Sequence, residues 1–449
     1  MDYKLPNEVT IILDKFKEAR YQIYIVGGAV RDLLMGRAVT DWDFTTDAKP
    51  EEILKVSPEG FYDNKFGTVG IAIENQVFEI TTMRKEGDYL DHRHPTEIGW
   101  TNKIEEDLAR RDLTIDAIAA SITPSKDGIQ ITDPFNGRQD IKDKIIRTVG
   151  DPQKRFQEDA LRLIRAIRIA TQLEFSIEDT TFKAIQSNAQ LIKEVAFERI
   201  RDELFKLLGS ANPYMGVIKL REVHILQIIL PELEKCFGLQ QMGPKHDRVY
   251  DIGEHSLLAL KHTPSSNPLV RLAALLHDVG KPDTVNIQTD GNVTFYQHDV
   301  IGGRIVLEIA KKFNLSKKQA DKLYKLVRWH MFSVSENQTD SAIRRFIKNV
   351  GLENIDDLMA VRVGDRLGGG TQTETSWRIE KFKSRIKQVL TKPFSISDLK
   401  VNGGDVMKVL NIKPGPKVGE ILQKLFDEVL EDSSKNTPEY LLKKTKLVA

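Results

Sequence analysis

The sequence contains a single cysteine, Cys236, and no long apolar run. One thiol excludes an intramolecular disulfide and a zinc site built from cysteines. No stretch approaches the ~18 apolar residues that a membrane-spanning helix needs, and residues 1–4 do not begin an apolar signal segment. The 66 basic residues nearly balance the 65 acidic ones, which excludes a uniformly basic coat for nucleic acid but allows local basic stripes. These absences predict a soluble, cytoplasmic protein with no membrane association.

The remaining composition is that of a folded globular chain. Of its 449 residues, 40% are apolar and 29% are charged, so we expect roughly two to four domains with real cores. Strand and helix signals alternate at first, whereas helical spacing dominates later, as at Leu163, Ile167 and Ala170. We therefore predict an α+β chain, in which a head with a small mixed sheet and helices precedes an all-α body, a further helical domain and a helical tail. Breaks in composition place these domains at residues 1–150, 151–242, 243–370 and 371–449.

Turn residues in the head divide it into short elements. Pro50 suits the first turn of a helix, and Asn75 suits a turn between two strands. Polar and turn residues dominate 84–100, which we expect to form a mobile loop. The pattern predicts strands at 22–26, 41–45, 68–74 and 76–83, and helices at 29–35, from 50 and from 104.

A glycine pair joins the first expected strand to the first expected helix. Gly27 and Gly28 would let the backbone approach a phosphate closely, the free N–H groups of the helix start would face the anion, and Arg31 would add charge. An ordinary strand-to-helix turn is the alternative interpretation. The residues that follow this turn are what favour the phosphate-binding interpretation.

Two acids, Asp41 and Asp43, follow ten residues after this turn. Residues two apart on a strand point the same way, so both carboxylates would face one point and repel each other unless a cation lies between them. Mg²⁺ prefers such oxygen ligands and leaves positions open for phosphate. Glu79, on a nearby expected strand, is either a third carboxylate of this site or an exposed acid. A glycine turn beside a carboxylate pair is what in-line phosphoryl displacement requires.

Two charged segments, 106–117 and 158–168, add further candidates. In the first, Arg111 and Asp112 could hold a triphosphate and a ribose hydroxyl. In the second, Asp159 and Arg162 are three apart on an expected helix and would lie side by side, and Arg165 and Arg168 continue the row. A solvated, salt-bridged helix face is the alternative for this second segment.

Taken in order, these four motifs resemble the class II tRNA nucleotidyltransferases, the CCA-adding enzymes, which are related to bacterial poly(A) polymerases. The resemblance spans about residues 20–240 and implies transfer of C, C and A from CTP and ATP to the 3′ end of tRNA. It implies that Asp41 and Asp43 hold a catalytic Mg²⁺, with Glu79 beside them. The implied nucleotide-binding residues are Gly27, Gly28, Arg31, Arg111, Asp112, Asp159, Arg162, Arg165 and Arg168.

The base-reading role has a chemical basis of its own. Cytosine and adenine both present an exocyclic amino group beside a ring-nitrogen acceptor, so a carboxylate can accept from the first while a guanidinium donates to the second. Uracil and guanine present carbonyls there and would be mismatched. Asp159 and Arg162 could therefore select CTP and ATP without a nucleic-acid template.

The polar segment at 84–95 resembles the flexible loop of complete CCA-adding enzymes. Its presence favours CCA synthesis, or addition of A alone, over addition of CC alone. We interpret His92 and His94 as loop residues and not as metal ligands.

A second set of residues follows from position 250 onward. An adjacent pair, His277 and Asp278, ends an apolar run and can offer nitrogen and oxygen to one metal ion. With its spaced partners, the pair resembles HD-superfamily phosphohydrolases, which implies a divalent transition metal or Mg²⁺ and hydrolysis of a 2′,3′-cyclic phosphate or a phosphomonoester. The implied ligands are His255, His277, Asp278 and Asp365, with His298 and His330 as additional residues for a second metal or for phosphate.

The C-terminal segment resembles the tail of some CCA-adding enzymes, and Lys413 and Lys417 would steer RNA toward it. An ordinary helical hairpin is the alternative interpretation. Two rival functions stay open: an A-adding enzyme or poly(A) polymerase, and an RNA-binding HD phosphohydrolase. The sequence does not decide the oligomeric state.

Overall fold

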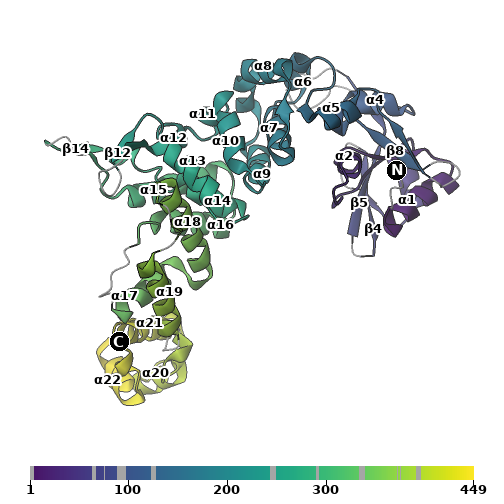
Figure 1. Cartoon of the computed structure of the whole chain (residues 1–449). Coiled ribbons are helices and arrows are strands. Elements are labelled where there is room, and N and C mark those ends of the chain that lie inside the picture. The colour runs from purple at the N-terminus through teal and green to yellow at the C-terminus, as the bar shows by residue number, and fades with distance from the viewer. Residues whose placement is uncertain are drawn as a thin grey trace. The chain divides into compact units, whose positions relative to one another are not determined.

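The computed structural model divides into two compact units, Met1–Pro231 and Glu232–Ala449, which are described separately (Figure 1). The description covers residues 5–62, 67–74, 76–87, 98–122, 128–242, 249–289, 293–332, 339–371, 373–374, 376–390 and 396–448. Several sequence predictions lie outside these residues: the turn at Asn75, the loop tip with His92 and His94, and most of the break at 242–244. No described helix has the length and apolar character needed to cross a membrane.

The first unit begins with a seven-stranded mixed sheet in the order β3-β4-β5-β2-β1-β8-β9. Strand β2 is antiparallel to β1 and parallel to β5, and β1 is antiparallel to β8. Its buried core includes Phe16, Ile25, Phe44 and Ile80. The strands are β1 (Ile23–Val26), β2 (Asp43–Thr46), β3 (Phe61–Tyr62), β4 (Thr68–Ile73), β5 (Gln76–Thr82), β8 (Ala119–Ile122) and β9 (Ile129–Thr132).

Helices of the head pack against this sheet and connect its strands. Pro50 occupies the first turn of its helix, as expected, and the helix after Gly27 begins at Gly28, one residue earlier than predicted. The helices are α1 (Asn7–Glu18), α2 (Gly28–Leu34), α3 (Pro50–Val56), α4 (Ile104–Ala109), η1 (Thr114–Asp116) and α5 (Gly137–Asp143). The ends of the expected loop 84–100 instead form an antiparallel pair, β6 (Arg84–Glu86) with β7 (Ile98–Trp100).

Helices make up most of the rest of the first unit: α6 (Pro152–Glu158), α7 (Leu161–Leu173), α8 (Asp179–Asn188), η2 (Ala189–Glu194), α9 (Phe197–Leu208), α10 (Pro213–Glu222) and α11 (Leu226–Ile229). Two short strands, β10 (Ile145–Ile146) and β11 (Ser176–Ile177), pair in parallel and were not predicted. The continuous helix expected over 158–168 is wrong. Asp159 has extended backbone angles, so the chain breaks between α6 and α7.

The second unit is mainly helical, as predicted, and packs α13, α14, α15, α16 and α18 around one another. These helices are α13 (Ile252–His262), α14 (Pro268–Leu276), α15 (His298–Lys312), α16 (Lys317–Arg328) and α18 (Ile355–Gly368). Four short strands form two antiparallel pairs, β12 (Gln240–Met242) with β13 (Val249–Asp251) and β14 (Asn286–Ile287) with β15 (Val293–Thr294). The short helices η3 (Pro282–Thr284) and η4 (Leu352–Asn354) complete this part.

A separate apolar core holds the C-terminal helices together, with Val406, Leu425 and Leu441 at its centre. The buried Arg344 donates hydrogen bonds to the carbonyl groups of Val429 and Leu430. These carbonyls lie at the C-terminal end of α21, where the helix itself offers no N–H donors. The elements are α12 (Pro231–Glu234), α17 (Asp340–Val350), α19 (Trp377–Leu390), η5 (Ile396–Asp398), α20 (Gly403–Leu410), α21 (Pro416–Glu431), η6 (Ser433–Lys435) and α22 (Pro438–Val448). The predicted order of a mixed sheet with helices followed by helical parts is confirmed.

Candidate active sites

The glycine corner of the head brings together residues from three motifs. Gly27 has a φ of +70°, which a side chain would strain. A Cβ atom at this position would lie 3.0 Å from Arg111 Nη1 and 3.8 Å from Asp43 Oδ2. The corner, the arginine and the acid are therefore neighbours, although up to 84 positions separate them in the sequence.

The two acids lie close enough for their charges to interact. Asp41 is exposed, Trp42 is buried and Asp43 is partly buried, and β2 begins only at Asp43, so Asp41 precedes the strand. Burial raises the pKa of the Asp43 carboxyl, and the charge of Asp41 raises it further, whereas Arg111 opposes them. Glu79 is the partner of Asp43 across the parallel β2–β5 pair, so it belongs to the same face. Two carboxylates whose charges interact, as those of Asp41 and Asp43 do, form a fitting donor pair for a divalent cation.

Arg31 is held by acids on both sides. Its Nη1 donates to Asp116 Oδ1 at 2.6 Å and its Nε to Asp32 Oδ1 at 3.0 Å. The side chains of Arg31 and Asp116 are only 14% and 13% exposed. Asp116 was not singled out in the sequence analysis, although it lies within the charged segment 106–117.

Asp112 and Arg165 form a link between the head and the helices that follow it. Arg165 Nε lies 3.2 Å from Asp112 Oδ2. Burial alone would raise the pKa of Asp112, but Arg165 and Arg162 outweigh it and hold the pKa below its usual range. Asp107, which is fully buried, pairs with Arg110 Nη2 at 2.9 Å and Arg111 Nη2 at 3.5 Å. This second pair fixes the arginine that borders the glycine corner.

Asp159 and Arg162 do not lie side by side on one helix as predicted. Asp159 lies two residues before α7 begins. Its Oδ1 accepts from the Leu161 N–H at 3.1 Å, and its Oδ2 accepts from Arg199 Nη2 at 2.9 Å. Arg162 Nη1 instead contacts Glu158 Oε2 at 2.5 Å. Asp159 precedes α7 and Arg162 lies in its first turn, and the Arg162 N–H donates to the Asp159 carbonyl oxygen at 3.0 Å, so the two residues stay neighbours across the break.

Arg168 has hydrogen-bond partners that differ from those of Arg162 and Arg165. Its Nε donates to Glu203 Oε2 at 2.5 Å and its Nη1 to Gln172 Oε1 at 2.6 Å. The row Arg162–Arg165–Arg168 therefore has three different acidic partners. Arg199 and Glu203 both belong to α9, and sequence reasoning missed them because nothing local marks a partner about 35–40 positions away.

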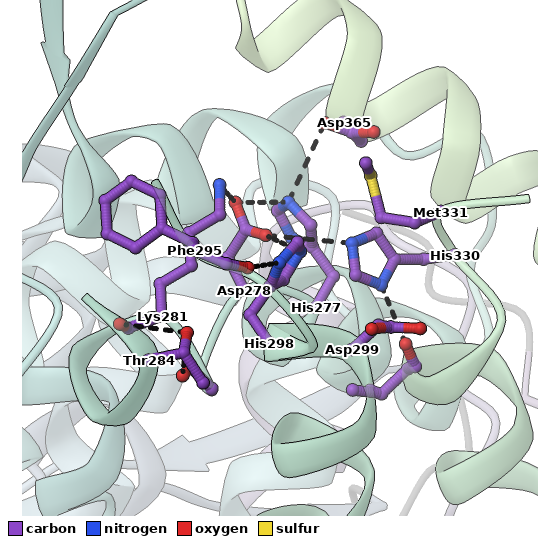
Figure 2. A network of polar contacts seen from close by, with 12 residues as sticks. His277, Asp278, Lys281, Thr284, Phe295, His298, Asp299, His330, Met331 and Asp365 are labelled. Atoms are coloured by element: carbon purple, nitrogen blue, oxygen red, sulfur yellow. Dashed lines mark hydrogen bonds and ion pairs between the residues drawn. The ribbon is translucent and has the colours of Figure 1, made fainter. Parts of the chain in front are cut away.

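Six side chains of the predicted HD set converge in the second unit. Figure 2 shows five of them, His277, Asp278, His298, His330 and Asp365. His255 comes from α13, Asp365 from α18, and His277 and Asp278 follow α14. His255 Nε2 lies 3.1 Å from His277 Nε2 and 3.3 Å from Asp365 Oδ1. The convergence predicted from the sequence is present.

Asp278 lies between two groups of histidines. Its Oδ2 is 3.1 Å from His277 Nε2 and 3.5 Å from His255 Nε2. Its Oδ1 is 3.4 Å from His298 Nε2 and 3.7 Å from His330 Nε2. One carboxylate thus faces both groups through different oxygens.

Backbone hydrogen bonds orient three of the imidazole rings. The Nδ1 atoms of His277, His298 and His330 lie 2.7, 2.8 and 2.7 Å from the carbonyl oxygens of Ala274, Phe295 and Val327. With Nδ1–H donated to the backbone, Nε2 is the ring nitrogen left to face the cluster. This outer-shell arrangement is the one that metal-ligating histidines use, so the residues fit a divalent ion.

The carboxylates of the cluster stay ionised despite burial. Burial alone would raise their pKa values, but His277 and Lys281 hold the pKa of Asp278 well below its usual range. The hydrogen bond from His255 and the charges of His277 and Arg362 do the same for Asp365. A cavity of about 670 Å³ opens beside the cluster.

Comparisons with known proteins identify the family of the chain. A family model described as "Poly A polymerase head domain" matches residues 23–147, one described as "Probable RNA and SrmB- binding site of polymerase A" matches 174–237, and a tRNA nucleotidyltransferase domain 2 model matches 306–445. A CCA-adding enzyme of Ligilactobacillus salivarius (strain UCC118) is 32% identical over 443 residues, which cover 97% of this chain and 95% of the relative.

A second relative and a solved structure extend the similarity. A CCA-adding enzyme of Staphylococcus saprophyticus is 32% identical over 92% of this chain and 91% of its own length. The crystal structure of the Bacillus stearothermophilus CCA-adding enzyme in complex with CTP matches with a TM-score of 0.67 and 26% identity, covering 98% of this chain and 97% of that one. The chain is a nucleotidyltransferase and belongs to the family of CCA-adding enzymes.

Proposed function

We propose that this chain adds C, C and A to the 3′ end of tRNA from CTP and ATP without a nucleic-acid template. The observation that carries the proposal is the convergence of Asp43, Gly27 and Arg111 at one corner of the sheet. The family membership and the CTP complex of a solved relative support it.

The residues of the head divide the work of the transfer. The backbone at Gly27 and Gly28, with Arg31 and Arg111, binds the phosphates of the nucleotide. Asp41 and Asp43 would hold Mg²⁺, which would neutralise charge on the transferring phosphoryl group, and Glu79 pairs with Asp43 across β2 and β5. The 3′-hydroxyl of the tRNA attacks the α-phosphate in line, and pyrophosphate leaves.

The residues around the α6–α7 break select the base. Asp159 accepts a hydrogen bond from the amino group of cytosine or adenine, and Arg162 donates to the ring nitrogen. Arg165 holds Asp112 beside the nucleotide, and Arg168 fixes α7 against α9 at the edge of this pocket. The acid and the guanidinium are each held by one further side chain, Arg199 and Glu158.

Sequencing of the 3′ ends made from a truncated tRNA with mixed nucleotides tests this function. We expect CCA ends, and we expect CTP alone to support incorporation on a tRNA that lacks all three nucleotides. Addition of A alone would instead indicate an A-adding enzyme or a poly(A) polymerase. Asp43→Ala should abolish addition.

We also propose that residues 371–449 form a tRNA-binding tail, with 1–150, 151–242 and 243–370 as the head, the nucleotide-selecting body and the HD domain. Lys413 and Lys417 flank the start of α21 and would attract the RNA backbone in a salt-dependent way. Their replacement by Ser should weaken tRNA binding in a filter-binding assay and reduce its salt dependence. Cytoplasmic tRNA as substrate would place the enzyme in the cytoplasm.

A second activity is favoured by the histidine cluster, which we propose to be a metal-dependent phosphohydrolase site. His255, His277, Asp278 and Asp365 would hold a divalent transition metal or Mg²⁺, and since Asp278 also faces His298 and His330, the set can accept one ion or two. A bound divalent ion would activate water for attack on a phosphoester. The substrate class is a 2′,3′-cyclic phosphate or a phosphomonoester.

Hydrolysis of a 2′,3′-cyclic nucleotide in the presence of Mn²⁺, Ni²⁺, Co²⁺ or Mg²⁺ tests the second activity. His277→Ala and Asp278→Ala should abolish it in folded protein, whereas Asp43→Ala should leave it intact. No hydrolysis with any of these metals would refute it without affecting the proposed nucleotide addition.

A further inference from the structure

The mouth of the cavity beside the histidine cluster carries exposed apolar side chains. Val293, Tyr296 and Met331 line it and are 37%, 74% and 54% exposed. Ile287, at 71% exposed, is the antiparallel partner of Val293, so both side chains lie on the same face of that strand pair. Exposed apolar side chains beside a concave polar site are typical of the rim of a ligand-binding site.

The backbone around Gln297 aims one aromatic ring outward. Gln297 has a φ of +62°, a left-handed conformation that costs a residue with a side chain about 1 kcal/mol. This turn leaves Tyr296 in solvent, while His298 is 8% exposed and reaches Asp278. An aromatic ring therefore lies at the mouth of the cavity, two residues from the cluster.

Cationic side chains line the same cavity. Arg362 and Arg366 are one turn apart on α18 and both face it. Arg362 Nη1 is bound to Asp365 at 2.8 Å, whereas Arg366 Nε is buried and has no hydrogen-bond partner in the described part of the chain. Lys281 is already engaged by Asp278 and Gln241. Arg366 therefore has donor capacity left for an anion.

We infer that this cavity binds one nucleotide at an RNA end, with its phosphate on Arg366 beside the cluster and its base stacked on Tyr296. The inference rests on the proposed phosphohydrolase site and names what that site recognises. A bare phosphate would make no use of the apolar rim. A volume of about 670 Å³ lies within the 300–1,000 Å³ typical of small-ligand sites, which suits one nucleotide on a polar floor.

Binding measurements on the full chain loaded with Mn²⁺ test the inference without relying on turnover. The probes are a nucleoside 3′-phosphate, ribose 5-phosphate, which lacks the base, and inorganic phosphate. Base–aromatic stacking of about 1–3 kcal/mol predicts that the nucleotide binds about 5- to 150-fold more tightly than the sugar phosphate. Tyr296→Ala should remove that advantage, and Arg366→Met should weaken all three probes.

Tyr296→Trp supplies a spectroscopic readout of the same contact. The fluorescence of the added tryptophan should be quenched by the nucleoside 3′-phosphate and not by ribose 5-phosphate. Subtraction of the wild-type signal removes any response from the nucleotide site of the head. Tyr62→Ala is the control, because Tyr62 is an exposed tyrosine, 51% accessible, in the other unit.

Equal affinity for the nucleotide and the sugar phosphate, or no effect of Tyr296→Ala, would overturn the inference. If only the proposed phosphohydrolase activity is wrong, the result differs. Cyclic nucleotides would then bind in a Tyr296-dependent way but would not be hydrolysed with any metal.

Discussion

Replacement of Arg199 by Met should weaken the choice between CTP and UTP. Arg199 holds Asp159 through Nη2 to Oδ2 at 2.9 Å and Nη1 to Oδ1 at 3.4 Å. In the proposed mechanism, Asp159 accepts from the amino group of the base. Without Arg199, the carboxylate loses the partner that orients it, while the phosphate-binding residues of the head stay in place.

The magnitude follows from the exposure of the pair. A hydrogen bond to a charged group contributes about 1.5–3 kcal/mol when buried, and an exposed ion pair about 0.2–1 kcal/mol. The two side chains are 29% and 19% exposed, so we expect an intermediate effect of about 1–2 kcal/mol. This corresponds to about a 5- to 30-fold loss in the ratio of kcat/KM for CTP to that for UTP.

Single-nucleotide incorporation on a truncated tRNA measures this ratio. Arg201→Met is the matched control, because Arg201 lies on the same helix and pairs with its neighbour Asp202, not with Asp159. The control should keep the wild-type ratio. If Arg199→Met also keeps it in a folded protein, the idea that a positioned Asp159 selects the base is refuted.

Three further changes test the two sites. Gly27→Ala should raise KM for CTP, because φ is +70° and the new Cβ would lie 3.0 Å from Arg111 Nη1; steady-state kinetics check this, and an unchanged KM contradicts it. Asp107→Asn should destabilise the chain by about 3 kcal/mol in urea unfolding at pH 7, because it leaves two arginines without their buried acid. The pKa of Asp107 is lowered in the folded state by Arg110 and Arg111 against the effect of burial. Its stabilisation is therefore present above the unfolded-state pKa of about 3.9 and lost below it, and the difference between variant and wild type should shrink as the pH falls through this range. His277→Ala should lower the bound divalent metal measured by mass spectrometry, and equal metal content would contradict the cluster's proposed role.

The order of the fold followed from local patterns in the sequence. Glycine pairs, alternation of apolar residues and helical spacing act over a few positions, and these predicted the mixed sheet, the helical remainder and the elements around Gly27 and Asp43. The same local rule predicted that Asp41 and Asp43 share one side of the chain, because successive side chains on an extended chain alternate.

Contacts between distant segments were decided only by the tertiary structure. At the break, Asp159 pairs with Arg199, which lies 40 positions away, and no local pattern distinguishes that break from a continuous helix. The sequence supplied the histidines and aspartates of the second unit, but packing of five helices set which oxygen of Asp278 faces which ring. Side-chain types and short-range spacing are encoded along the chain, whereas partner choice depends on which surfaces the buried core brings together.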